Sequence, residues 1–365
     1  MKIILCIRQL LLAVAFAVVP LAYGHDNEQS SNTRIAVQAS PARTYYAQAN
    51  VKSGNTKNLQ VNLDALVQSA KAEGGLTIYV AFTGLGERVV EGFGTKYGIK
   101  AQFLRMPSVP LLQRYSTEAE SGNIAADLII NAGGFFAEEG VKKGWLERIT
   151  EAGIPVIASG EFPSKFNNGL TAIAGVVPWG FVYNTEKLKG ADIPKDWPDL
   201  LNAKFRGQIL LADPRSSDTY FDLWSLLSQK YGDSFFSRLR AQDMRQYPSA
   251  VPATQALGAG EGSLMLINLA PSALAYKKKG APVDIITPDF TTGVEIHIMM
   301  TARAKAKHPN AARLLAHYVL SPEGNRWINN ASISIFDSAE LPKEYQSPTQ
   351  LTPARREALV KLLGL

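Results

Sequence analysis

Cysteine is almost absent from this sequence: the single one among 365 residues is Cys6, inside the apolar stretch at the N-terminus. If that stretch is removed during export, the product has no thiol. A disulfide framework, a thiolate metal site and a cysteine nucleophile are therefore excluded together. A lipid anchor is also disfavoured, because no cysteine stands at the predicted cleavage point.

An excess of charge of one sign is also missing. The chain has 38 basic and 32 acidic residues, a net charge of +6, with no dense basic stripe and no interleaved aromatic residues. We therefore expect no nucleic-acid partner, because nucleic-acid binding needs such a surface. The charged fraction of 19% and the hydrophobic fraction of 46% exclude wholesale disorder and leave enough apolar residues for a sizeable core.

Familiar catalytic motifs are absent as well: the sequence has no G-x-S-x-G, H-E-x-x-H or P-loop pattern. His308 and His317 fall at or within a predicted helix over residues 309–320, where surface exposure is expected. His297 alternates with Glu295 in an apolar segment, which favours a packed histidine over a catalytic base. We expect no enzymatic activity, no cofactor and no metal site.

Residues 1–24 have the pattern of a secretory signal peptide, with Lys2 and Arg8 flanking the start of an apolar run over Leu10–Leu21. A membrane anchor is the alternative, but a spanning helix needs ~20 apolar residues. We therefore expect cleavage and export to the periplasm. Residues 25–60 are rich in Ser, Asn, Gln, Ala and Thr and are predicted to be a flexible leader.

Apolar patterns of helix and strand type alternate after the leader. A helix is predicted from Val61 to Gly74, and strands followed by helices then recur up to a helix that begins near Phe135. A second series of strands and helices runs from Val176 to Ile286. Three further helices are predicted to begin at Pro309, Pro322 and Pro353. The predicted fold class is therefore α/β, with two mostly parallel sheets flanked by helices.

Four turns that follow predicted strands are rich in glycine or small polar residues. They are Thr83-Gly84-Leu85-Gly86, Pro107-Ser108, Asn131-Ala132-Gly133-Gly134 and Arg215-Ser216-Ser217-Asp218-Thr219. The carboxyl ends of parallel strands meet at one edge, where helix starts present free N–H groups and a partial positive charge. Tight turning or helix capping explains each turn alone, but the set predicts a solute held between two domains.

Two stretches carry a family resemblance that runs from about Ala70 to Asn329. They are WGFVYNTEKLKGADIPKDWPDLLNAKFRGQILLADPRSSDTY, from Trp179, and SPEGNRWINN, from Ser321. The chain resembles the periplasmic solute-binding proteins of ABC importers, in the ferric-iron and organophosphate or phosphonate branch of the type II superfamily. The resemblance implies two α/β lobes joined by two hinge crossings that close over one solute. It assigns residues 61–177 and 291–365 to lobe 1 and residues 178–290 to lobe 2.

The resemblance also implies which residues bind the solute. They are Thr83, Gly84, Ser108, Asn131, Ala132, Trp179, Arg215, Ser216, Ser217, Asp218, Thr219 and Asn268. Arg215 either pairs with a carboxylate or phosphonate of the solute or is an exposed loop residue. Trp179 either stacks on the solute or packs at the hinge.

The sequence departs from this family at two places. Iron-binding members have two adjacent tyrosines after an ILIN-like strand, whereas this chain has Ala270 and Pro271. A ferric ion prefers anionic oxygen donors, so a bare iron site is disfavoured; the adjacent Tyr45 and Tyr46 lie in the predicted leader. Asp218 stands where phosphate-binding relatives often have glycine, and a carboxylate there disfavours a phosphate ester.

We therefore expect a non-enzymatic monomer that captures a small anionic or zwitterionic solute and delivers it to an ABC permease in the inner membrane. An iron carrier that uses other oxygen donors is the first alternative. The alternative of another class is a secreted hydrolase that works through Asp218, Glu295 and His297.

Overall fold

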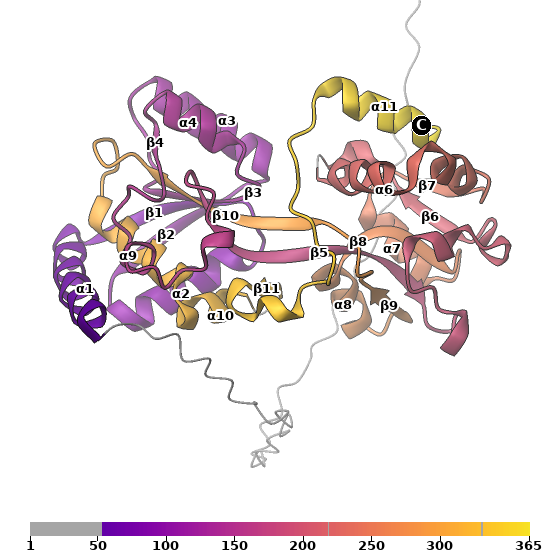
Figure 1. Ribbon diagram of the computed structural model, residues 1–365, viewed down its shortest axis with the longest axis horizontal. Coiled ribbons are helices and arrows are strands. Elements are labelled where there is room, and N and C mark those ends of the chain that lie inside the picture. Colours follow the sequence, from indigo (N-terminus) through magenta and orange to yellow (C-terminus); the bar gives the residue numbers. More distant parts are fainter. Residues whose placement is uncertain (1–52, 218, 330) are drawn as a thin grey trace, which may run out of the picture. The chain divides into compact units, whose positions relative to one another are not determined.

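The computed structural model describes residues 53–217, 219–329 and 331–365, with side chains from Leu63 onward (Figure 1). The predicted signal peptide, most of the predicted leader, the tyrosine pair Tyr45 and Tyr46, and Asp218 lie outside the described residues. None of the described helices has both the length and the apolar character that crossing a membrane requires.

The described strands form one eleven-stranded sheet whose path runs β2-β1-β3-β10-β5-β8-β6-β7. The strands on this path are β1 (Gly75–Val80), β2 (Lys100–Arg105), β3 (Leu128–Ala132), β5 (Ala172–Asn184), β6 (Ile209–Ala212), β7 (Arg245–Tyr247), β8 (Leu264–Leu269) and β10 (Gly293–Thr301). The strands beside it are β4 (Leu146–Glu147), β9 (Val283–Ile286) and β11 (Ile333–Ser334). Strands pair in parallel within β1–β3 and within β6–β8, and antiparallel wherever β5 or β10 takes part. The predicted α/β class is confirmed.

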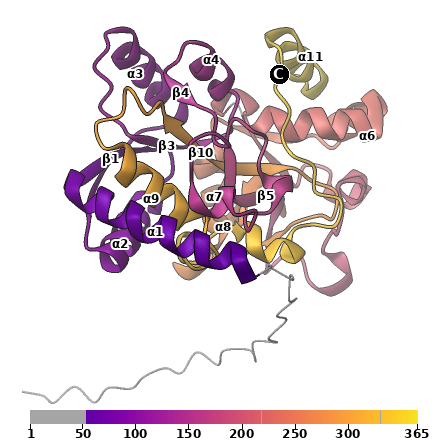
Figure 2. The same ribbon diagram turned by 60° about the vertical axis from the view of Figure 1, so that its left-hand side comes forward.

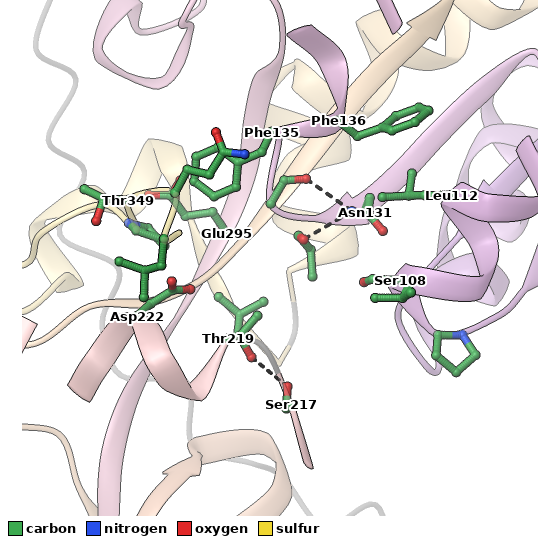
Figure 3. A pocket seen from close by; sticks show the side chains of 18 of the residues that line it. Ser108, Leu112, Asn131, Phe135, Phe136, Ser217, Thr219, Asp222, Glu295 and Thr349 are labelled. Carbon is green, nitrogen blue, oxygen red and sulfur yellow. Dashed lines mark hydrogen bonds between the residues drawn. The ribbon is translucent and has the colours of Figure 1, made fainter. Parts of the chain in front are cut away.

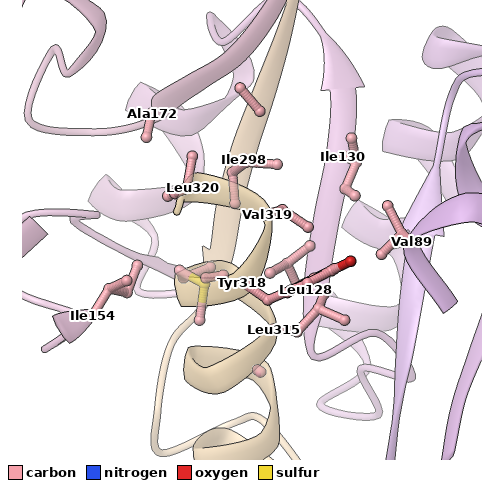
Figure 4. Packing of buried hydrophobic residues seen from close by; sticks show 14 of the residues in the cluster. Val89, Leu128, Ile130, Ile154, Ala172, Ile298, Leu315, Tyr318, Val319 and Leu320 are labelled. Atoms are coloured by element: carbon pink, nitrogen blue, oxygen red, sulfur yellow. The ribbon is translucent and has the colours of Figure 1, made fainter. Parts of the chain in front are cut away.

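Helices cover both faces of the β1–β3 end of the sheet (Figures 1 and 2). The helices around this end are α1 (Ser53–Glu73), α2 (Leu85–Tyr97), α3 (Ser108–Glu120), α4 (Phe136–Lys142), α5 (Pro155–Ala158), α9 (Pro309–Leu320) and α10 (Pro322–Ile328). Ile78 and Val80 of β1 pack in the cluster with α1, α2 and α9, whereas Tyr79 packs in the cluster with α3 and α4. This division follows because successive strand residues point to opposite faces. Figure 4 shows Leu128 and Ile130 of β3 in the first of these clusters.

The first helix is longer than the sequence predicted. We expected it to begin near Val61 after a leader that ends at residue 60, but α1 begins at Ser53. A helix that is already formed gains one backbone hydrogen bond for each residue added, so polar residues extend it without any apolar pattern. Its C-terminal end agrees with the prediction, because Gly74 follows with φ 83°, the left-handed conformation that glycine adopts at no steric cost.

A second core forms around β6, β8 and the later part of β5. The helices there are α6 (Tyr220–Arg240), α7 (Ala250–Gly258), α8 (Ala270–Lys278) and α11 (Pro353–Leu363). Leu359 and Leu363 of α11 are buried in this cluster, and Arg240 Nη1 donates to the Leu362 carbonyl oxygen at 2.7 Å. The expected assignment of residues 291–365 to lobe 1 is therefore corrected, since the last helix packs on lobe 2.

Three segments thus run between the two cores. The first half of β5, up to Pro178, pairs with β10, and its second half, from Trp179, pairs with β8 and β9. The sequence-based prediction of two crossings omitted the third, residues 342–352, which we call the strap. The strap has no helix or strand of its own, so no apolar period indicated it.

His317 is buried, with an exposed fraction of 7%, contrary to the expectation that it would lie on the surface. It lies in α9, whose apolar residues face the first core on more than one side. Burial, and to a lesser extent the positive charge of Lys96, lower the pKa of His317 to about 4. The imidazole is therefore neutral in the folded protein over the whole physiological pH range.

The lowered pKa of His317 predicts a specific acid sensitivity. The folded value of about 4 lies below the ordinary value of 6.5, so the unfolded chain binds the proton more readily between these two pH values. The contribution of neutral His317 to the free energy of unfolding is therefore fully present above pH 6.5. It is lost as the pH drops toward 4, by roughly 3 kcal/mol in all. In urea unfolding as a function of pH, His317→Leu should flatten this part of the profile; a profile parallel to that of the parent protein would contradict the assignment.

Candidate functional site

Residues from both cores line one cavity of about 530 Å³ (Figure 3). On the lobe 1 side the lining comes from the start of α3 and from the turn after β3. On the lobe 2 side it comes from the loop after β6 and from the first turn of α6. Gly293, Val294 and Glu295 of β10, residues 348–351 of the strap and Arg356 of α11 complete it. A solute in this cavity would contact both lobes at once.

The lobe 1 side contains three of the predicted residues, Ser108, Asn131 and Ala132. The Asn131 side chain is buried, and its Nδ2 donates to the carbonyl oxygens of Ala132 and Gly133 at 3.1 and 3.2 Å. These two bonds fix which end of the amide is nitrogen. The turn after β3 is therefore held in shape by the first residue of the predicted Asn131–Gly134 motif.

The lobe 2 side contains Arg215, Ser216, Ser217 and Thr219. Ser217 Oγ and Thr219 Oγ1 are 3.0 Å apart and hydrogen-bonded, and Figure 3 shows them across the cavity from Ser108. Hydroxyl groups both donate and accept hydrogen bonds, so this pair suits either a carboxylate or a hydroxyl of a solute.

Arg215 is already engaged by a neighbouring carboxylate. Its Nε and Nη2 donate to Asp213 oxygens at 2.9 and 2.6 Å, and this pairing lowers the pKa of Asp213. A guanidinium has five N–H donors, so donors remain after these bonds. Arg215 is thus oriented by Asp213 and lines the cavity.

Glu295 is a buried carboxylate at the base of the cavity, with an exposed fraction of 5%. Its Oε2 lies 3.2 Å from His297 Nε2, and its Oε1 accepts a hydrogen bond from the Tyr345 hydroxyl at 3.1 Å. Burial alone raises the pKa of Glu295, but the hydrogen bonds from His297, Ser347 and Tyr345 outweigh it and the net pKa is lowered. Glu295 is therefore ionised at neutral pH.

Glu295 and His297 lie on one face of β10, as their alternation predicted. Thr171 continues the row of hydrogen-bonded side chains that they form. His297 Nδ1 is 2.8 Å from Thr171 Oγ1, so hydroxyl, imidazole and carboxylate follow one another. The exposed fraction of Thr171 is 0%, and a Cβ on Gly134 would stand 2.9 Å from its hydroxyl oxygen. The backbone at Gly134 thus covers these hydrogen bonds. The buried Thr171 and His297 side chains hold the Glu295 carboxylate in place.

The strap is held against the hinge region by its backbone. The Glu344 and Gln346 amide groups donate to the carbonyl oxygens of Asp289 and Thr291 at 3.0 and 2.9 Å. The Glu344 carboxylate also pairs with Lys230 of α6 at 2.9 Å. These contacts place Thr349 and its neighbours along the cavity.

Four of the predicted site residues that the structure describes do not line this cavity. Thr83 and Gly84 lie at the start of α2, and Gly84 has φ 75°, which accounts for glycine in that tight turn. Trp179 is buried and packs edge-on against Tyr220 at 5.2 Å, so it packs at the hinge. Asn268 points into the second core, where its Nδ2 donates to Thr254 Oγ1 at 3.0 Å. Asp218 lies outside the described residues.

Several lining residues were not among the predicted ligand-binding residues. They include Val109, Phe135, Phe136, Asp222, Glu295, Arg356 and the strap residues 348–351. Phe135 and Phe136 directly follow the predicted Asn131–Gly134 turn, and Asp222 lies in the first turn of the helix after the predicted loop. Extending each motif by one helical turn would have found these three. No local pattern indicated Arg356 or the strap, since both reach the cavity only through the third crossing.

Two lobes connected by hinge strands, with a cavity lined by both, define the class of two-lobed solute-binding proteins. Residues 123–359 match the family described as "Bacterial extracellular solute-binding protein", which is more than half of the chain. The chain therefore belongs to this family. Membership implies a periplasmic location, a small-molecule ligand and an ABC permease as partner.

The chain is also similar to individual proteins in sequence and in fold. An uncharacterized protein of Haemophilus influenzae is 28% identical over 313 residues, which cover 79% of this chain and 85% of the relative. Among solved structures, the periplasmic binding protein AfuA from Actinobacillus pleuropneumoniae has a TM-score of 0.56 and 23% identity, covering 80% of this chain and 99% of AfuA. Iron-bound HitA from Pseudomonas aeruginosa has a TM-score of 0.58 and 18% identity, covering 80% of this chain and 99% of HitA. These structures share the fold.

The contact between Tyr345 and Glu295 predicts the effect of Tyr345→Phe. The variant removes one hydrogen bond from a buried carboxylate and keeps the ring, so the free energy of unfolding should fall by about 1.5–3 kcal/mol. Urea unfolding at pH 7 measures this. Tyr97→Phe, at a ring that packs beside Phe93 at 5.3 Å, is the matched control and should change stability by less than about 1 kcal/mol. Equal effects of the two variants would show that the strap is not anchored through Glu295.

Proposed function

We propose that this protein is the solute-capturing component of an ABC importer and that it holds a small anionic or zwitterionic solute in the cavity between its lobes. The observation that carries this proposal is that the two lobes line the same cavity. A solute that bridges both lobes binds the closed arrangement better than the open one, and this difference in affinity drives hinge closure.

The chemistry of the lining supports a polar, charged solute. The charged side chains of the lining have both signs: Arg215, Arg356, Asp222 and Glu295. The hydroxyl groups of Ser108, Ser217 and Thr219 add donors and acceptors on both sides. A lining of both signs favours a solute that itself has both signs, or one anionic group together with hydroxyl groups.

The cavity volume supports a small molecule. About 530 Å³ lies within the range of about 300–1,000 Å³ that is usual for ligand pockets. AfuA was solved with fructose-6-phosphate and HitA with iron, so proteins of this fold take different ligands. The ligand class of this protein must therefore be argued from its own lining residues.

The iron alternative finds little support in these residues. The described part of the chain contains no group of three or more His, Cys, Asp or Glu side chains close enough to hold a metal ion. Ala270 and Pro271 stand where the family resemblance placed two tyrosines, and both begin α8. An organic solute bound by hydrogen bonds and ion pairs suits the lining better than a ferric ion.

A screen of small solutes tests the proposal. Sugar phosphates, phosphonates, carboxylates, amino acids, amines and ferric salts are compared by thermal shift, followed by calorimetry on those that stabilise the protein. A one-to-one charged organic ligand that is not consumed is the expected result. In addition, small-angle scattering should show a smaller radius of gyration with that ligand. Stabilisation by ferric salts alone would favour the iron carrier, and turnover of the ligand would favour a hydrolase.

The hydroxyl pair in the loop after β6 gives a site-specific prediction. Ser217→Ala combined with Thr219→Ala removes two groups of the lobe 2 wall, at about 1 kcal/mol for each lost hydrogen bond. Affinity for the ligand found in the screen should fall roughly 10- to 30-fold, while the melting temperature of the empty protein stays nearly unchanged. Ser237→Ala, on the exposed part of α6, is the control. Undiminished affinity of the double variant would remove this loop from the binding site.

A further inference from the structure

The two sides of the cavity differ in chemical character. On the lobe 1 side, Val109 and Phe135 have exposed fractions of 54% and 46%, and both line the cavity. They are two of only five large hydrophobic residues that are exposed among the described residues. Because they come from separate helix starts, α3 and α4, their meeting at one cavity is produced by the fold.

Core packing explains one neighbouring aromatic residue but not Phe135. Phe136 packs edge-on against the buried Tyr115, with ring centroids 6.0 Å apart, and belongs to the core between α3 and the sheet. Phe135 precedes it by one residue and is about half exposed. Figure 3 shows the two rings pointing in different directions. An exposed phenyl ring at a cavity offers a contact surface for an apolar group.

Hydroxyl groups lie on both sides, but apart from Glu295 of β10 the charged side chains of the lining lie on the lobe 2 side. Ser217, Thr219, Asp222 and the oriented guanidinium of Arg215 lie on this side. A solute that satisfies both sides needs an apolar part for lobe 1 and a charged head for lobe 2. A purely polar solute would leave Val109 and Phe135 against polar groups or water, which gains no apolar burial.

We infer that the solute class is amphipathic: an acid or amino acid whose charged head contacts lobe 2 and whose aromatic ring or branched aliphatic group packs on Phe135 and Val109. This inference rests on the proposed function and specifies its ligand. Phe135 and Val109 are then the residues that select the apolar group, while the hydroxyl pair binds the head. The arrangement separates selectivity and anchoring between the two lobes.

Paired probes test the inference. Each pair has the same head and differs only in the apolar part: benzoate and acetate, phenylphosphonate and methylphosphonate, phenylalanine and glycine. Calorimetry on the full exported protein should show, for at least one pair, binding of the ring-bearing member about 10-fold or more tighter than its partner. Phe135→Ala should bring this ratio close to one, and Phe135→Tyr should restore it.

Three further variants separate the roles of the two sides of the cavity. Ser217→Ala with Thr219→Ala should weaken both members of a pair equally and leave the ratio unchanged. Leu274→Ala, at an exposed apolar residue outside this cavity, should change neither affinity. Val109→Ser should lower the ratio like Phe135→Ala, and because both positions are exposed, neither variant is expected to unfold the protein.

The outcomes distinguish this inference from the proposed function. Binding of both members with equal affinity would overturn the inference and leave the proposed function intact. If Phe135→Ala weakened the binding of both members of a probe pair equally, the inference would also be overturned. The ring would then stabilise the closed lobes and would not select the apolar group of the solute. Failure of all six probes to bind, together with binding of a purely polar charged solute such as a sugar phosphate, would overturn the inference and leave the proposed function intact.

Discussion

The antiparallel pairing of β5 with β10 is the constraint on which the rest of this structure depends. Both strands are buried almost throughout, so their backbone groups must be satisfied by pairing. Their approach is close enough that a Cβ on Gly293 would stand 2.5 Å from the Val177 carbonyl oxygen. Through this pair, β3 of the first core and β8 of the second belong to one sheet, and the cavity lies beside the point where β10 leaves lobe 2.

The same crossing accounts for the unusual position of Glu295. A carboxylate with an exposed fraction of 5% is costly unless it is hydrogen-bonded, and here His297 supplies one partner from β10 and Tyr345 another from the strap. The buried charge thus couples the second crossing to the third. It also places a fixed negative charge at the base of the cavity, where the solute of a periplasmic binding protein would be enclosed.

Much of the fold follows from local patterns. The repeated strand and helix units, the left-handed glycine after α1 and the proline starts of α9, α10 and α11 depend on residues that are neighbours in sequence. The sequence-based predictions were wrong where long-range contacts decide the position of a residue or helix. The α9 helix has neighbours on several sides, so His317 is buried, and α11 lies on the second core because the strap carries it there. For the site, the turns at Asn131 and Arg215 were predicted from their place after strands.

By itself the sequence determined the class of this protein: alternating α/β units, a single cysteine among 365 residues, and polar turns at the ends of strands. These features are local, because hydrogen-bond capacity and apolar period belong to short segments. Only the tertiary structure decided which turns meet in one cavity, that Trp179 and Asn268 are turned into the core, and that Phe135 and the strap line this cavity. Such facts depend on side-chain direction and on the route of the chain between lobes, and both are set by the packing of distant segments.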